Sequence, residues 1–116
     1  MTDLKLYHNP RCSKSRAALQ LLQARGLSPQ IIPYLDSPLN SGQLQSLLQK
    51  LGISARQLLR SGEDEYKALA LSNPQLSESE LIEAMVQHPR LIERPILETI
   101  DRAVIGRPPE TILELL

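Results

Sequence analysis

The segment around the only cysteine constrains the fold of this chain more than any other stretch. A short alternating run over residues 4–6 predicts a strand, and Asn9 with Pro10 predicts a turn after it. From residue 13 to residue 24 the apolar residues fall on one stripe, which is typical of an amphipathic helix. The sequence therefore predicts a strand, a turn and a helix in immediate succession, with Cys12 where the helix begins.

Cys12 is predicted to carry a reactive thiol. The unpaired N–H groups of a helix N-terminus stabilise a thiolate, and an imidazolium from His8 or a guanidinium from Arg11 or Arg16 would add to that effect. A thiol with a pKa of about 8.5 is only roughly 3 % ionised at pH 7, whereas a pKa about two units lower makes the thiolate the main form. The alternatives are an inert buried cysteine and, for His8, a hydrogen bond that stabilises the turn. The polar neighbours of the cysteine favour the reactive thiol.

The composition limits the functions open to the chain. Its 116 residues predict one domain, and its 13 basic and 13 acidic side chains balance, so neither nucleic acid nor an anionic membrane is an expected partner. One cysteine cannot close an internal disulfide, so a redox cycle at Cys12 needs a thiol from another molecule. The first residues lack the pattern of a signal peptide, and no apolar run is long enough to span a membrane. We therefore expect a soluble protein of the reducing cytoplasm.

A helical segment interrupts the predicted sheet. Residues 30–34, which follow Gly26, predict a second strand parallel to the first. From about residue 39 to residue 88 the pattern changes to a helical insert within the single domain of residues 1–116. Its helices are expected at residues 44–51, at 55–59, at 64–71 and after a capping box at 77–80.

The last part of the chain returns to strands. Residues 91–92, 96–100 and 103–105 predict one or two further strands, with a turn at residues 101–102. Residues 110–116 predict a final helix after two prolines. The predicted order is β-α-β, helical insert, β-β-α, which is the α/β layout of a thioredoxin-like mixed sheet.

Three loop arginines are candidates for an anion site. Arg94 and Arg107 each precede a proline, which favours extended backbone, and Arg60 follows a short predicted helix. One interpretation is ordinary solvated charge. The other is that they converge on Cys12 and hold a tetrahedral oxyanion through paired N–H donors. Pro95 is also a candidate for a cis peptide bond, although trans is the commoner form.

Four segments together resemble the glutaredoxin-coupled arsenate reductase family, and the likeness runs in register over nearly the whole chain. The segments that carry this resemblance are residues 7–16 (YHNPRCSKSR), 52–60 (from GI to LLR), 88–96 (HPRLIERPI) and 106–110 (GRPPE).

The resemblance implies a thioredoxin-like fold with a helical insert and a role for each matching residue. Cys12 would be the nucleophile that attacks arsenate, His8 would help to keep it ionised, and Ser15 would place a hydroxyl near the thiolate. The remaining matches are the oxyanion-binding arginines Arg60, Arg94 and Arg107 and the cis-proline Pro95.

The chemistry of that family also agrees with a lone cysteine. Attack of the thiolate on arsenic(V) would give an enzyme-arsenate thioester, glutathione would then attack and reduce the metalloid, and glutaredoxin would resolve the mixed species to release arsenite. Glutathione is thus an expected co-substrate and glutaredoxin an expected partner, with no bound cofactor and no metal.

Two other functions stay open at this stage. The loop at residues 11–15 carries charged residues where well-characterised resistance enzymes have smaller uncharged ones, which leaves room for a glutathione-dependent thiol oxidoreductase with little arsenate activity. Related regulators of the same fold dock on RNA polymerase and sense oxidation through a Cys-x-x-Cys switch, but this chain has Ser15 in place of the second cysteine.

Overall fold

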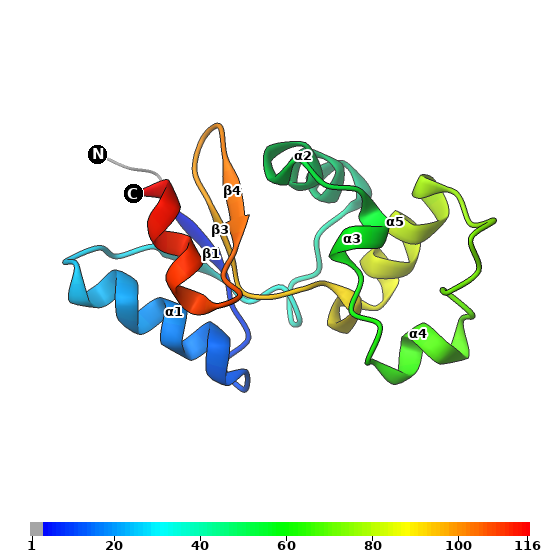
Figure 1. The fold of residues 1–116 in the computed structure, drawn as a ribbon, viewed down its shortest axis with the longest axis horizontal. Helices are drawn as coiled ribbons and strands as arrows, with labels where there is room; N and C mark the ends of the chain where they lie inside the picture. The colour runs from blue at the N-terminus through cyan, green and yellow to red at the C-terminus, as the bar shows by residue number, and fades with distance from the viewer. Residues whose placement is uncertain (1–3) are drawn as a thin grey trace. The chain divides into compact units, whose positions relative to one another are not determined.

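The computed structural model describes residues 4–116 and divides the chain into two units. One unit, the sheet unit, takes the described residues through Ser37 together with Arg94–Leu116, and the other, the helical unit, is Pro38–Glu93 (Figure 1). The helical unit covers the predicted insert and a few residues on either side of it. That the chain is a single domain stays a prediction.

The sheet unit contains a mixed four-stranded sheet. Its strands are β1 (Lys5–Tyr7), β2 (Gln30–Ile32), β3 (Ile96–Glu98) and β4 (Ala103–Ile105), in the order β2-β1-β3-β4 (Figure 1). β1 is parallel to β2 and antiparallel to β3, and β4 is antiparallel to β3. The predicted β-α-β and β-β-α order is therefore confirmed.

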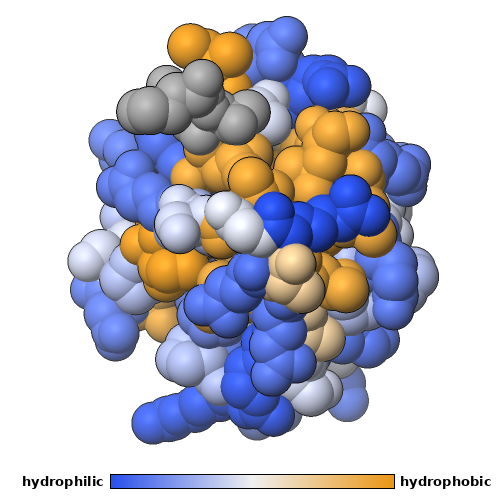
Figure 2. All heavy atoms as spheres, turned by 90° about the vertical axis from the view of Figure 1, so that its left-hand side faces the viewer, coloured by the Kyte–Doolittle hydropathy of each residue, from blue (hydrophilic) through white to orange (hydrophobic). Residues whose placement is uncertain are grey.

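One face of the sheet packs against two helical segments. α1 (Ser13–Ala24) and the C-terminal 3₁₀ helix (Pro109–Leu115) contact each other, and the latter also contacts β4. The strand register places Leu6 opposite Leu97, and both are fully buried in a core with Leu22 of α1. The predicted helix at residues 13–24 is confirmed. Its apolar stripe packs on this face of the sheet, which stabilises the helix. Figure 2 shows that apolar side chains also reach the surface on this side of the molecule.

The helical unit is built by local capping signals. Its elements are α2 (Ser41–Leu51), α3 (Ala55–Leu58), α4 (Asp64–Ala68), α5 (Glu78–Gln87) and the 3₁₀ helix Pro89–Leu91. Capping boxes begin α2, α3 and α5, at Asn40, Ser54 and Ser77, and the last of these is the one predicted from the sequence. α5 packs against both α2 and α3. Among the helices of residues 4–116, none has the length and apolar character needed to cross a bilayer.

Several boundaries differ from those predicted. β2 ends at Ile32 because Pro33 has no N–H to donate and the N–H of Tyr34 turns back to the carbonyl of Ile32. α4 ends at Ala68, and Ala70 takes a positive φ of 52° that terminates the helical path.

Two further segments have another type of secondary structure than the one predicted. Residues 91–92 form no strand, because the N–H of Leu91 closes a 3₁₀ turn onto His88 and Ile92 makes only an isolated bridge with Leu59. The last helix is 3₁₀ over Pro109–Leu115 and begins one residue earlier than predicted.

A buried polar bond ties β1 to β3. The Tyr7 hydroxyl donates to Glu98 Oε1 over 2.6 Å, and both side chains are buried. Tyr7 lies opposite Ile96, so this bond runs diagonally between the strands. Burial, followed by the hydrogen bond and the charge of Glu98, raises the pKa of Tyr7 far above its ordinary value. Tyr7 therefore stays a neutral donor to the carboxylate.

Tyr7→Phe is expected to lower the free energy of unfolding by roughly 1.5–3 kcal/mol, because the buried Glu98 carboxylate loses a charge-assisted hydrogen bond. Urea unfolding followed by circular dichroism measures this. Tyr66→Phe is the matched control, since no side-chain hydrogen bond of Tyr66 is recorded among the described residues, and it should change stability by a few tenths of a kcal/mol. Equal losses in the two variants would contradict the role given to the bond.

Candidate active site

Cys12 is the N-cap residue of α1. Its backbone is extended, with φ −95° and ψ 122°, and its carbonyl accepts the N–H of Arg16 over 3.0 Å as the first hydrogen bond of the helix. Its own N–H donates to the carbonyl of Asn9 over 3.0 Å, which closes the turn between β1 and α1. The residue is partly exposed, and its thiol is free. The predicted place of Cys12 at the start of the helix is confirmed.

Asn9 organises the loop that carries the cysteine. Its side-chain oxygen accepts the N–H of Arg11 over 3.0 Å, and its own N–H donates to Ser15 Oγ over 3.0 Å. Nη1 of Arg16 donates to the carbonyl of Pro10 over 2.9 Å and holds the other side of the loop. The sequence predicts Asn9 only as part of a turn. The Asn side chain bonding two residues ahead is a known turn signal that points to this role.

The ends of three strands bring the basic residues to the cysteine loop. Tyr7 ends β1 opposite Ile96, which begins β3, and Ile96 lies opposite Ile105, which ends β4. All three ends therefore lie at one edge of the sheet. Arg94 stands just before β3 and Arg107 just after β4, so both arginines reach the edge from which the cysteine loop leaves.

A tight contact sets the backbone at this edge. Both Arg94–Pro95 and Arg107–Pro108 are cis peptide bonds. A Cβ on Gly106 would lie 2.9 Å from Pro95 Cγ and 3.0 Å from Ile112 Cγ2, closer than packed atoms tolerate. The N–H of Gly106 donates to the carbonyl of Pro95 over 2.8 Å. Only glycine lets the segment before Arg107 approach the segment after Arg94 this closely.

Arg94 and Arg107 both act on the sulfur of Cys12. Arg107 Nε donates to the carbonyl of Arg94 over 2.7 Å, and this places its Nη2 at 3.9 Å from Cys12 Sγ. Burial works to raise the pKa of Cys12, but the backbone N–H of Ser15, the Arg94 guanidinium and the backbone N–H of Lys14 outweigh it, so the pKa is lowered. The distance from Arg107 is long even for a sulfur acceptor, and Arg94 has the larger effect on the thiolate.

His8 and Ser15 form a buried pair behind the loop. His8 Nδ1 lies 2.6 Å from Ser15 Oγ, and Ser15 is fully buried. Burial, and then the charge of Arg16, lower the pKa of His8, so the ring is neutral near pH 7. This disfavours the imidazolium considered from the sequence. The contact that His8 does make is the one with Ser15, whose own N–H helps to lower the pKa of Cys12.

Arg60 belongs to the helical unit. Its N–H donates to the carbonyl of Leu91 over 2.8 Å, and its Nη1 forms an ion pair with Glu93 Oε1 at 2.8 Å. Its Nε is buried and has no hydrogen-bond partner among the described residues. Its convergence with the other two arginines on Cys12 stays a prediction.

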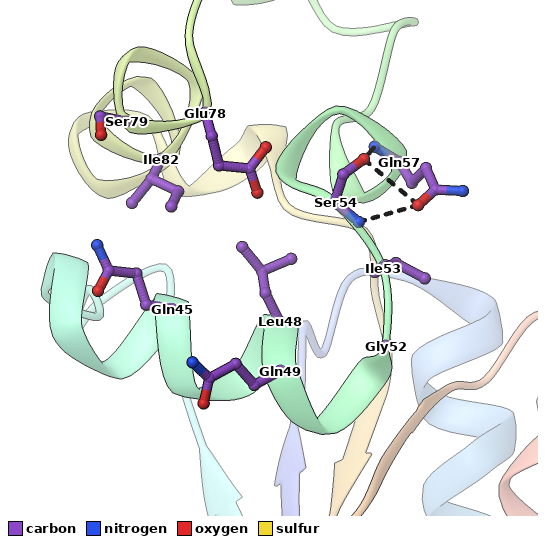
Figure 3. Close-up of a pocket in the computed structure, with 10 residues that line it drawn as sticks. All are labelled: Gln45, Leu48, Gln49, Gly52, Ile53, Ser54, Gln57, Glu78, Ser79 and Ile82. Atoms are coloured by element: carbon purple, nitrogen blue, oxygen red, sulfur yellow. Dashed lines mark hydrogen bonds between the residues drawn. The ribbon is translucent and has the colours of Figure 1, made fainter.

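A cavity of about 430 Å³ in the helical unit contains none of the predicted site residues. It lies among α2, α3 and α5 over Leu48 and Ile82 (Figure 3). Ser54 and Gln57 bond to each other in a capping box, and Glu78 Oε2 accepts the N–H of Ala55 over 2.8 Å. These polar groups already serve the ends of helices. Among residues 4–116, no group of three or more His, Cys, Asp and Glu side chains is arranged to hold a metal ion.

Comparison with known proteins agrees with this geometry. The model of the ArsC family matches residues 7–115. The chain belongs to the ArsC family. It is 50% identical over 112 residues to the arsenate reductase of Haemophilus influenzae, which covers 96% of this chain and 97% of that protein. It is also 51% identical over 114 residues to the protein YfgD of Escherichia coli K12, named as uncharacterized, with 97% and 96% covered.

Solved structures give the same result for the fold. The structure described as the arsenate reductase from Vibrio cholerae matches with a TM-score of 0.97 and 46% identity, covering 99% of this chain and 98% of that one. This ArsC protein therefore has the thioredoxin-like fold predicted from its sequence, with a mixed sheet that carries the cysteine loop and both basic residues at one edge.

Arg94→Met is expected to slow alkylation of Cys12 by iodoacetamide at pH 6 by roughly 3- to 10-fold, because it removes a cation that lowers the thiol pKa. In the native protein, the alkylation rate should rise with pH through a midpoint below that of a free cysteine. A pH series with mass-spectrometric detection measures both. Arg25→Met, an exposed arginine at the far end of α1, should keep the native profile. Identical midpoints in the two variants would rule out the effect of Arg94 on the thiolate.

Proposed function

We propose that this protein reduces arsenate to arsenite, with Cys12 as the nucleophile and with glutathione and glutaredoxin as external reductants. The observation that carries the proposal is the meeting of a partly exposed thiol of lowered pKa with Arg94 and Arg107 at one edge of the sheet. A nucleophile needs the thiolate form, and an oxyanion needs N–H donors beside it. Relatives described as arsenate reductases, at 46–50% identity over nearly the whole chain, support the choice of substrate.

The proposed reaction balances with two external thiols. The Cys12 thiolate forms a bond to arsenic(V), and one arsenate oxygen leaves as water. Glutathione displaces a second oxygen as water, so that arsenic(V) carries two sulfur ligands. The glutaredoxin thiolate then attacks the glutathione sulfur, an S–S bond forms, and the electron pair of the broken As–S bond reduces arsenic(V) to arsenic(III). Water releases arsenite and returns the Cys12 thiolate.

The other predicted residues have supporting roles in this scheme. Arg94 and Arg107 neutralise the oxyanion as the sulfur approaches, and Arg60 supplies a third guanidinium. Ser15 and His8 position the N-cap loop through their buried contact. The lone cysteine and the external thiols suit the reducing cytoplasm, where free thiols persist.

The two alternative functions considered from the sequence differ from arsenate reduction in the substrates and residues that they need. A thiol oxidoreductase without arsenate activity has no need for guanidinium groups at the sulfur. A Cys-x-x-Cys regulator needs a second thiol at position 15, where Ser15 is fully buried with its hydroxyl against His8.

Turnover can be measured as NADPH consumption in an assay coupled through glutathione reductase. It should require arsenate, glutathione and glutaredoxin together, and should stop when any one of them is omitted. Cys12→Ser should lower the rate to that of the omission controls, because serine provides no thiolate. Turnover with 2-hydroxyethyl disulfide as the oxidant, together with no turnover of arsenate, would favour the thiol oxidoreductase. A wild-type rate from Cys12→Ser would remove this residue from the mechanism.

Arg94→Ala and Arg107→Ala are each expected to lower kcat/KM for arsenate by roughly 10- to 100-fold. Each variant loses a charge-assisted contact with the anion, and such a contact contributes about 1.5–3 kcal/mol. Arg25→Ala is the control for an exposed arginine of the same unit and should stay within about twofold of the native enzyme. Similar effects from all three would make Arg94 and Arg107 ordinary surface charges.

A further inference from the structure

The cysteine loop carries exposed cations that the oxyanion site leaves unused. Arg11 and Lys14 flank Cys12, and both are exposed. Neither side chain has an ion pair or hydrogen bond to another described residue, whereas Arg16 bonds to the carbonyl of Pro10. Neither side-chain cation is among the groups that lower the pKa of Cys12. Their charges are therefore exposed, lie one and two residues from Cys12 in the sequence, and are not paired with another described residue.

The placement of Lys14 is unfavourable for the helix itself. The first turn of α1 contains no acidic residue and carries Lys14 and Arg16 at the positive end of the helix dipole. From residue 4 to residue 35 the sequence contains no Asp or Glu, although the whole chain is neutral. The positive charge around Cys12 is thus local and is not offset by neighbours in the sequence. A helix that needed only stability would have acidic residues in this turn.

Two different anions have to reach Cys12 in the proposed reaction. The proposed reaction assigns the oxyanion to Arg94 and Arg107, whose guanidinium groups approach the sulfur. The attacking thiol arrives from solvent, where the exposed Arg11 and Lys14 lie. Separate cations for the two reactants avoid competition between them.

We propose that Arg11 and Lys14 form a subsite for the carboxylates of the small thiol that attacks the species bound to Cys12. This inference rests on the proposed function, which requires such a thiol, and glutathione has the chemistry that fits. Its two carboxylates lie at the two ends of the tripeptide, on either side of the cysteine that carries its sulfur, and the two cations are one and two residues from Cys12 on either side. Cations this close to the nucleophile match a small molecule better than an acidic patch spread over a protein partner.

The test uses disulfide exchange, which needs no arsenate. The Cys12 thiolate attacks one sulfur of a disulfide, forms a mixed disulfide and releases the other half as a thiolate. The probes are glutathione disulfide, which carries carboxylates, and 2-hydroxyethyl disulfide, which is neutral. The variants are Arg11→Gln, Lys14→Gln and the double variant, with Arg25→Gln as the control on the same helix.

The double variant is expected to react with glutathione disulfide roughly 10-fold more slowly at low ionic strength, and with the neutral disulfide within about twofold of the native rate. Each single variant should react with glutathione disulfide at a rate between those of the native protein and the double variant. Added salt should remove the difference between these rates. In the coupled assay, the double variant should raise KM for glutathione and leave KM for arsenate unchanged.

Three outcomes would overturn the subsite. The first is that the double variant leaves the ratio of the two exchange rates unchanged, and the second is that it slows exchange equally with both probes. The third is that it raises KM for glutaredoxin and leaves KM for glutathione unchanged. The last would assign the cations to an acidic protein surface. A chain that shows the expected exchange ratio but no arsenate turnover with any thiol would instead refute the proposed function and leave the subsite in place.

Discussion

The site depends on the stabilisation of one negative sulfur at the end of a helix. Burial opposes the thiolate, and the N–H groups of the first turn of α1 together with Arg94 overcome that opposition. These contributions come from two parts of the chain, so the pKa of Cys12 is lowered to this extent only when the first turn of α1 and the segment before β3 are both in place. The lowered pKa of Cys12 therefore combines backbone N–H groups two and three residues along the chain with one guanidinium from a distant segment.

Local patterns predicted those parts of the fold that local interactions decide. The helix at residues 13–24 and the capping box at Ser77 were predicted correctly, because periodicity and capping act within a few residues. The predicted ends of β2 and α4 were wrong. One depends on the missing N–H of Pro33, and the other on the positive φ of Ala70.

Interactions between distant segments were out of reach of such patterns. The bond from Tyr7 to Glu98 joins residues 91 positions apart, and a tyrosine and a glutamate carry no signal of that pairing. The meeting of Arg94 and Arg107 with Cys12 was one of two interpretations of the loop arginines. The sequence alone favoured solvated charge, and the family resemblance favoured the meeting. His8 shows the same limit, because its neutral state follows from burial that the sequence does not display.

The close packing of Gly106 against Pro95 and Ile112 limits which residue position 106 can hold. A methyl group there would overlap Pro95, so the segment after β4 would have to shift away from the segment before β3. The spacing of the two backbone segments that carry Arg94 and Arg107 therefore depends on the absence of a side chain at this one position.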